Sequence, residues 1–113
     1  MKIDDLKPKP TNKEQFKPIC FKLIPQKSGC YILTTFTDDI LYIGLAENLN
    51  SRFKQHLYNA EKTKATINGK AIWFHYMIFD QKNLPSLERT WLNQFLNIHA
   101  ILPILNKVSS PLS

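Results

Sequence analysis

Two tyrosines, an arginine, a histidine and a glutamate follow one another at spacings that fit phosphodiester chemistry. Tyr31 and Tyr42 are eleven residues apart in the sequence. Arg52 comes ten residues after the second tyrosine, and His56 comes four residues after the arginine. Glu88 follows on the next expected helix. Hydrolysis of a phosphodiester needs a water, a proton acceptor and positive charge on the phosphate. These five side chains are of the types that perform those tasks.

Positive charge gathers in two parts of the chain. The net charge is +6, and residues 1–28 carry seven lysines against three acidic residues. Residues 45–70 carry five basic residues against two acidic ones. Such a field favours a polyanion, most often nucleic acid, although a merely solvated lysine surface is the alternative. We expect nucleic acid as the partner, and the lysines expected to bind it are Lys9, Lys13, Lys54, Lys62 and Lys64.

Length and composition narrow the class of protein. A chain of 113 residues is long enough for one domain and one core. No apolar run approaches the roughly 20 residues that cross a bilayer, and the first residues lack a signal-peptide pattern. We therefore expect an intracellular, cytoplasmic protein without a membrane association. Cys20 and Cys30 have no zinc-ligand spacing and are expected to be free and buried.

The elements that must position these residues can be predicted from local patterns. β-branched and aromatic residues predict strands over residues 30–36 and 40–44, joined as a hairpin by a turn at 37–39. A third strand is expected over residues 71–79. A helix is expected from Asn48 or Asn50 to Glu61, and another from Asn83 to His99. The order β-β-α-β-α predicts an α/β (α+β) sandwich with a small, mainly antiparallel three-stranded sheet flanked by helices.

Apolar stripes predict which faces of the two helices are buried. The first helix has its stripe at Leu49, Phe53, Leu57 and Ala60. The second has its stripe at Leu84, Leu87, Trp91, Phe95 and Ile98.

The ends of the chain are expected to differ from its middle. Residues 1–18 are predicted to be a basic, proline-containing arm and residues 109–113 a flexible tail. Residues 19–108 are predicted to form the single domain. A short edge strand at residues 19–23 is also expected.

The expected elements place the chemical residues in pairs. Arg52 and His56 share one face of a helix because they are four residues apart. Tyr31 and Tyr42 lie on paired strands and are expected to flank each other on one face of the sheet. His56 and either tyrosine could accept a proton, and the sequence leaves that choice open. His75 is expected to be structural.

Taken together, these residues resemble a known catalytic domain. The runs Gly29-Cys30-Tyr31 and Leu41-Tyr42-Ile43-Gly44, with Asn50-Ser51-Arg52, His56, Glu88 and Asn106, are similar to the GIY-YIG endonuclease domain. The resemblance covers about residues 22–107. Cys30 departs from the family, in which the second residue of the first motif is usually Ile or Val.

The resemblance implies a role for each matching residue. Glu88 would hold the metal, one Mg²⁺ or Mn²⁺ per active site, and Arg52 would contact the scissile phosphate. Tyr31, Tyr42 and His56 would line the site and move protons. Gly44 and Asn106 would support it.

The expected function is that of a metal-dependent DNA endonuclease with structure-dependent or low sequence specificity, or one recruited by a protein partner. The alternatives are a non-catalytic nucleic-acid-binding module of the same fold and a lysine-rich interaction protein. Whether the protein is a monomer or a homodimer stays open.

Overall fold

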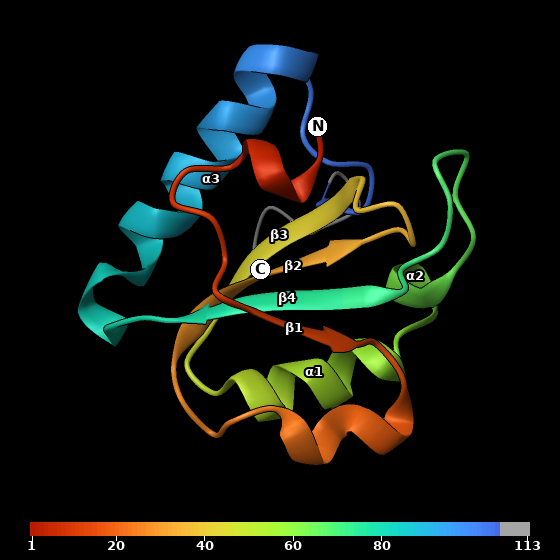
Figure 1. Cartoon of the computed structure of the whole chain (residues 1–113), viewed down its shortest axis with the longest axis vertical. Coiled ribbons are helices and arrows are strands. Elements are labelled where there is room, and N and C mark those ends of the chain that lie inside the picture. The colour runs from red at the N-terminus through yellow and green to blue at the C-terminus, as the bar shows by residue number, and fades with distance from the viewer. Residues whose placement is uncertain (107–113) are drawn as a thin grey trace.

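The computed structural model describes residues 1–106 as a four-stranded antiparallel sheet with helices on both faces (Figure 1). The strands, in the spatial order β1-β4-β2-β3, are Asn12–Gln15 (β1), Gly29–Thr34 (β2), Ile40–Ala46 (β3) and Trp73–Ile78 (β4). The α-helices are Leu49–Leu57 (α1), Ala60–Thr63 (α2) and Leu84–His99 (α3). Short 3-10 helices span Ile3–Asp5 (η1), Pro18–Leu23 (η2) and Gln81–Asn83 (η3). The predicted fold class is confirmed, with one strand more than the three predicted.

Strand β2 lies inside the sheet and is buried along its whole length. It pairs with β3 on one side and with β4 on the other. The β2–β3 hairpin confirms the expected turn, in which Asp38 adopts a left-handed conformation with φ of 69°. Aspartate tolerates that conformation better than most residues, so the turn residue suits its place.

Each face of the sheet has its own apolar core because successive side chains of a strand point to opposite faces. Tyr31 and Leu33 belong to the core that contains Phe53 of α1. Ile32 belongs to the core that contains Trp91 of α3. Figure 1 shows the result: α1 and η2 lie on one side of the sheet and α3 on the other.

Strand β1 is the strand that the sequence did not predict. It lies within residues 1–18, which were expected to be an arm, and it pairs with β4 at the edge of the sheet. Ile3, Leu6 and Phe16 of the same segment are buried. The segment packs on the domain because these apolar side chains enter the two cores.

The edge strand expected at residues 19–23 is wrong. Residues Pro18–Leu23 form the 3-10 helix η2 instead, with Pro18 at its first position. Proline suits that position because its missing N–H would have no partner there and its φ is already helical. Ile19 and Leu23 are exposed, so the alternation that favoured a strand does not reflect a buried face.

The first predicted helix begins as expected and ends early. The Asn48 side chain accepts a hydrogen bond from the Ser51 N–H at 3.1 Å and caps α1. The helix ends at Leu57, not at Glu61. A second short helix, α2, then begins after Asn59, whose side chain caps it by accepting from the Glu61 N–H at 2.9 Å. A capping asparagine inside the expected helix is the physical reason for the break.

Helix α3 matches its predicted bounds. Four of its five predicted core residues are buried: Leu84, Leu87, Trp91 and Phe95. The prediction that the fifth residue, Ile98, is buried is wrong, since 61% of it is exposed. The last turn of α3 extends beyond the strands of the sheet in the view of Figure 1.

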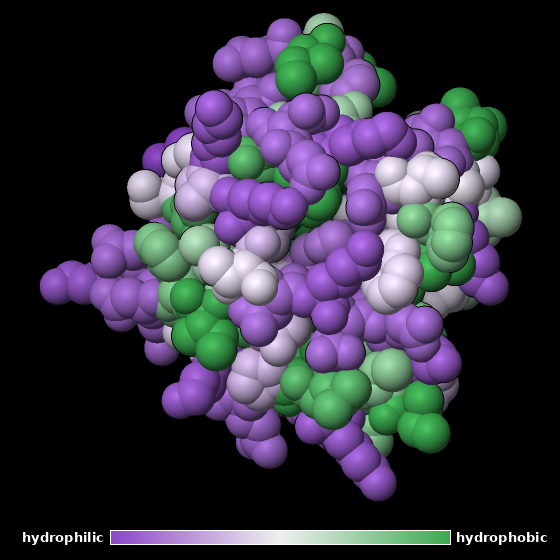
Figure 2. Space-filling model, in the orientation of Figure 1, coloured by the Kyte–Doolittle hydropathy of each residue, from purple (hydrophilic) through white to green (hydrophobic). Residues whose placement is uncertain are grey.

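The surface is mainly polar, with separate apolar patches on the face shown in Figure 2. Cys20 and Cys30 are free and buried, as predicted. Within the described part of the chain, no helix is long and apolar enough to cross a bilayer. The tail predicted over residues 109–113 lies outside the described residues.

Candidate active site

Three aromatic side chains meet on the α1 face of the sheet, and we call Tyr31, Tyr42 and His56 the tyrosine cluster. The Tyr31 hydroxyl and His56 Nε2 are hydrogen-bonded at 2.6 Å. The ring centroids of the two tyrosines are 5.9 Å apart, and those of Tyr42 and His56 are 5.3 Å apart. Tyr31 and His56 are buried, whereas Tyr42 is half-buried. Tyr42 is therefore the member of the cluster that solvent or a substrate can reach.

The strand register explains why the tyrosines meet. Tyr31 lies opposite Gly44, and Leu33 lies opposite Tyr42, so the tyrosines are diagonal neighbours on one face. The expected pairing on one face is thus confirmed. Gly44 leaves the room that both rings occupy, because a Cβ there would lie 2.7 Å from the Tyr31 hydroxyl and 2.8 Å from Cε2 of Tyr42.

Asn106 holds the outer edge of β3. Its side-chain Nδ2 donates to the Ile43 carbonyl at 2.8 Å, and its Oδ1 accepts from the Ile43 N–H at 2.9 Å. The amide thus pairs with the strand as a neighbouring backbone would. Ile43 lies between Tyr42 and Gly44, so Asn106 fixes the stretch of backbone that carries Tyr42.

Arg52 of α1 connects the tyrosine cluster to α3. Its Nη1 donates to the Leu45 carbonyl at 3.0 Å, which ties the half-buried side chain to the end of β3. The guanidinium charge acts to lower the pKa of Tyr31 on one side and of Glu88 on the other. Arg52 is therefore a charge that acts on both groups, one on strand β2 and the other on helix α3.

Glu88 of α3 is a half-buried carboxylate. Burial raises its pKa, while the charges of Arg52 and Arg89 act to lower it. Among residues 1–106 its side chain forms no hydrogen bond or ion pair. Burial raises the pKa of the neighbouring Cys30 thiol to about 12, and the Glu88 charge adds to that rise. A thiol with that pKa stays protonated and is not a nucleophile.

Burial also decides the protonation states in the tyrosine cluster. It raises the pKa of Tyr31 well above its ordinary value, with a further contribution from Tyr42. It lowers the pKa of His56 to about 3, with further contributions from the Lys62 and Arg52 charges. At neutral pH Tyr31 is therefore a neutral phenol and His56 a neutral imidazole.

The donor set around Glu88 fits one kind of metal and not another. No group of three or more His, Cys, Asp or Glu side chains comes together in residues 1–106. A zinc site with three or four protein ligands is therefore not formed by the described residues. Mg²⁺ keeps several waters and commonly takes one or two carboxylates together with substrate phosphate. A single carboxylate without a protein partner fits an ion of that kind.

The five lysines expected to bind DNA have different partners within the protein. Lys9 pairs with Asp4 at 2.6 Å, Lys13 lies 3.5 Å from Asp38, and Lys64 pairs with Glu61 at 2.8 Å. Lys54 lies over the ring of Phe21, with 4.9 Å from its Nζ to the ring centroid. The expected role of these lysines in DNA binding stays a prediction.

Lys62 differs from the other four lysines because it is buried. Its Nζ lies 4.7 Å from the centroid of the Tyr42 ring. The sequence analysis named Lys62 only as an expected DNA-binding lysine, after the end of the predicted helix at Glu61, and missed its place beside the tyrosine cluster. The signal that could have revealed it is Asn59, a capping residue that interrupts the expected helix.

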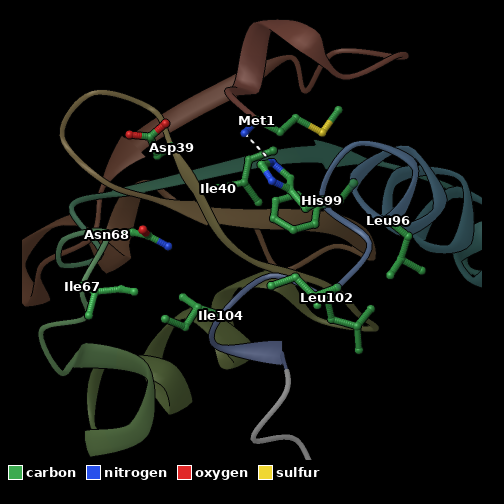
Figure 3. A pocket seen from close by; sticks show the side chains of 11 residues that line it. Met1, Asp39, Ile40, Ile67, Asn68, Leu96, His99, Leu102 and Ile104 are labelled. Atoms are coloured by element: carbon green, nitrogen blue, oxygen red, sulfur yellow. Dashed lines mark hydrogen bonds between the residues drawn. The ribbon is translucent and has the colours of Figure 1, made fainter.

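A wide groove lies away from the tyrosine cluster. It has a volume of about 870 Å³ and is lined mainly by aliphatic residues near the end of α3, including Leu96, Leu102 and Ile104 (Figure 3). The Met1 amino group and His99 Nε2, 2.7 Å apart, form its polar rim. No member of the tyrosine cluster lines this groove.

Fold, cluster and comparison with known families agree on the class of protein. The family model described as the GIY-YIG catalytic domain matches residues 27–99, which is more than half of the chain. The chain therefore belongs to the GIY-YIG family of nucleases.

Particular relatives are similar over shorter stretches. UvrABC system protein C of Clostridium tetani (strain Massachusetts / E88) is 31% identical over 65 residues, covering 54% of this chain and 10% of that protein. UvrABC system protein C of Limosilactobacillus reuteri (strain DSM 20016) is 36% identical over 42 residues, covering 37% of this chain and 7% of that protein. The chain thus matches no more than a tenth of the length of these curated relatives.

Proposed function

We propose that this protein is a metal-dependent DNA endonuclease that hydrolyses phosphodiester bonds at the tyrosine cluster. The observation that carries the proposal is the placement of Arg52, whose charge acts on Tyr31 of the tyrosine cluster and on Glu88 of α3, together with the half-buried Tyr42 that packs on Tyr31. Arg52, Glu88 and Tyr42 supply, in that order, a cation for the phosphate, a ligand for a metal and a hydroxyl at the surface. Membership of a nuclease family supports the same reaction class.

Tyr42 is the group we assign as the proton acceptor. Tyr31 is fully buried and its hydroxyl is already hydrogen-bonded to His56. His56 has a pKa of about 3 and is a poor match for proton transfer near neutral pH. Both therefore act by holding the Tyr42 ring, which packs against each of them.

The hydrolytic step follows from these assignments. A water oxygen forms a bond to phosphorus and gives a proton to the ionised Tyr42 hydroxyl. The bond from phosphorus to the leaving sugar oxygen breaks, and that oxygen takes a proton from solvent. Arg52 stabilises the negative charge that grows on the phosphoryl oxygens, since a guanidinium can contact two of them at once.

Glu88 is the residue we assign to hold Mg²⁺ or Mn²⁺, one ion per site. A bound ion would polarise the phosphoryl oxygen and stabilise charge on the leaving oxygen. One site cuts one strand, so a double-strand break would need a second copy or two successive nicks. Sequence specificity is expected to be low, or to come from the DNA structure or a recruiting protein.

The test is a nicking assay on supercoiled plasmid with Mg²⁺, Mn²⁺ or EDTA. It compares the wild type with Arg52→Ala and Glu88→Gln. Metal-dependent nicking that both variants lose is the expected result. A wild type that binds DNA in a salt-sensitive way without cutting it would replace the proposal with a non-catalytic binding module.

A further inference from the structure

Lys62 has an unusual environment for a lysine. Only 7% of the residue is exposed, and its Nζ faces the Tyr42 ring at 4.7 Å from the centroid. Within residues 1–106 it forms no ion pair, and the acid beside it, Glu61, pairs with Lys64 at 2.8 Å. Lysines are almost never this buried unless a partner compensates the charge.

Stability does not account for this placement. Burial lowers the pKa of Lys62, which shows that the environment disfavours its charged form. The Lys62 charge also acts to lower the pKa of His56, so the ammonium is directed at the tyrosine cluster. An apolar residue of similar length would fill the same space without a desolvation cost. A role for the charge itself explains why a lysine stands there.

The break between α1 and α2 creates the placement. In a continuous helix, Lys62 would lie nine residues after the buried Phe53, about 180° around the helix and in solvent. The Asn59 cap and the hydrogen bond from the Thr63 hydroxyl to the Asn59 carbonyl, 3.2 Å long, fix α2 in a new direction. That direction brings Lys62 over Tyr42.

The groups that face the Tyr42 side chain come from three elements. Tyr31 from β2 and His56 from α1 are neutral at neutral pH. Arg52 from α1 and Lys62 from α2 are positive. The carboxylate that acts on Lys62 is Glu61 of α2, which raises the pKa of Lys62 against the larger effect of burial and which pairs with Lys64 at 2.8 Å. The charged group that lies against the Tyr42 ring is therefore the Lys62 ammonium.

We propose that Lys62 is a positioning residue of the active site. Its ammonium group holds the Tyr42 ring by lying over the ring face, and it favours the ionised hydroxyl that accepts the proton from water. This inference rests on the proposed function. A cation over an aromatic face is attracted to the ring, more strongly when both are desolvated. The same charge stabilises a phenolate a few ångströms away. A phenol ordinarily ionises near pH 10, so a base role near neutral pH needs such help.

The experiment compares Lys62→Met with Lys13→Met, because each lysine lies over an aromatic ring and only one lies beside the tyrosine cluster. We expect Lys62→Met to lower kcat about tenfold at pH 7, and we expect the rate to recover as the pH rises. Its pH–rate profile should move up by about one unit, whereas that of Lys13→Met should not move. Thermal unfolding reports whether each variant is folded.

Two outcomes would overturn the proposal. An unchanged pH profile in Lys62→Met would show that the charge does not act on Tyr42. A raised Kd with a shallower salt dependence and an unchanged kcat would show that Lys62 binds phosphate directly.

A readout independent of cleavage separates this proposal from the proposed function. The ultraviolet absorbance of tyrosinate is followed against pH, and the curve of Tyr42→Phe is subtracted to isolate Tyr42. Lys62→Met should move that curve to higher pH even if the wild type does not cut DNA. An unmoved curve would overturn the role of Lys62 and leave the nuclease assignment untouched.

Discussion

Each face of the sheet holds a buried histidine and a lysine over an aromatic ring. On the α1 face, His56 packs beside Tyr42, and Lys62 lies 4.7 Å from the centroid of that ring. On the α3 face, His75 of β4 lies opposite Lys13 of β1, whose Nζ is 4.1 Å from the Trp73 ring centroid. The two regions are built from the same kinds of side chain.

They differ in how their charges are balanced. Asp38 Oδ1 lies 3.3 Å from His75 Nε2 and 3.5 Å from Lys13 Nζ, and we call Asp38, His75 and Lys13 the aspartate cluster. The tyrosine cluster has no carboxylate at a comparable distance among the described residues. Lys13 is also partly exposed, whereas Lys62 is buried.

The difference separates a structural role from a functional one. A buried polar group that only supports the fold is expected to find compensation inside the protein, as His75 does. Positive charge that is left uncompensated beside a reachable hydroxyl is available to an anionic substrate. The predictions below test that contrast between the two clusters.

The largest effect is expected for Glu88→Gln, which keeps the shape of the side chain and removes its charge. Loss of the metal ligand should lower kcat by about 10³-fold or more, because a bound ion stabilises the transition state by several kcal/mol. The nicking assay measures the loss. Retention of metal-dependent nicking would show that other residues hold the ion.

Gly44→Ala is expected to displace the rings of the tyrosine cluster, because its side chain would occupy their space. The new Cβ would lie 2.7 Å from the Tyr31 hydroxyl, so one ring must move. Overpacking of this kind costs about 1–3 kcal/mol of unfolding free energy. We also expect kcat to fall by about 10²-fold, since small displacements of positioned groups have effects of that size. Urea unfolding and nicking together measure the change, and normal activity would contradict the packing argument.

Asp38→Asn should lower stability without lowering activity. Asparagine keeps the shape and tolerates the positive φ, but it removes the anion that pairs with Lys13 and lies 3.3 Å from the neutral His75. The free energy of unfolding should fall by about 1–3 kcal/mol while nicking stays at the wild-type level. A loss of activity in a folded variant would show that the aspartate cluster also serves catalysis.

The two histidines predict a loss of stability in acid. Burial lowers the pKa of His56 to about 3 and that of His75 to about 4, where Asp38 acts to raise it. The unfolded chain takes up these protons near pH 6.5, so it binds more protons than the native state below that pH. Stability should therefore fall as the pH drops from about 6.5 toward 4, by up to about 1.4 kcal/mol per pH unit for each histidine.

The variant His56→Phe assigns this slope. This variant should remove the contribution of His56 to the slope of unfolding free energy against pH and leave the contribution of His75. Urea unfolding at several pH values measures both slopes. Equal slopes in the variant and the wild type would contradict the assignment to His56.

The smallest effects are expected on stability when each lysine becomes methionine. Lys13→Met removes a partly exposed ion pair and should cost less than about 1 kcal/mol. Lys62→Met removes an uncompensated buried charge and should leave the protein equally stable or more stable. A larger loss of stability in Lys62→Met than in Lys13→Met would reverse the contrast between the clusters.

The sequence by itself determined the features that depend on local signals. The β2–β3 hairpin, the Asn48 cap and the bounds of α3 follow from turn residues, capping residues and helical periodicity. The meeting of Tyr31 and Tyr42 follows from them as well, because a short hairpin leaves few registers. The catalytic roles of these residues stay predictions until they are measured.

Only the tertiary structure decided the rest. Residues 12–15 have no apolar alternation, and they form β1 because they pair with the backbone at the outer edge of β4. The aspartate cluster joins three residues from a turn and two strands, whose contact no local pattern encodes. Lys62 turns inward because α1 stops and α2 starts in another direction. Burial and charge compensation are properties of packing, so the sequence could name the lysine without revealing its environment.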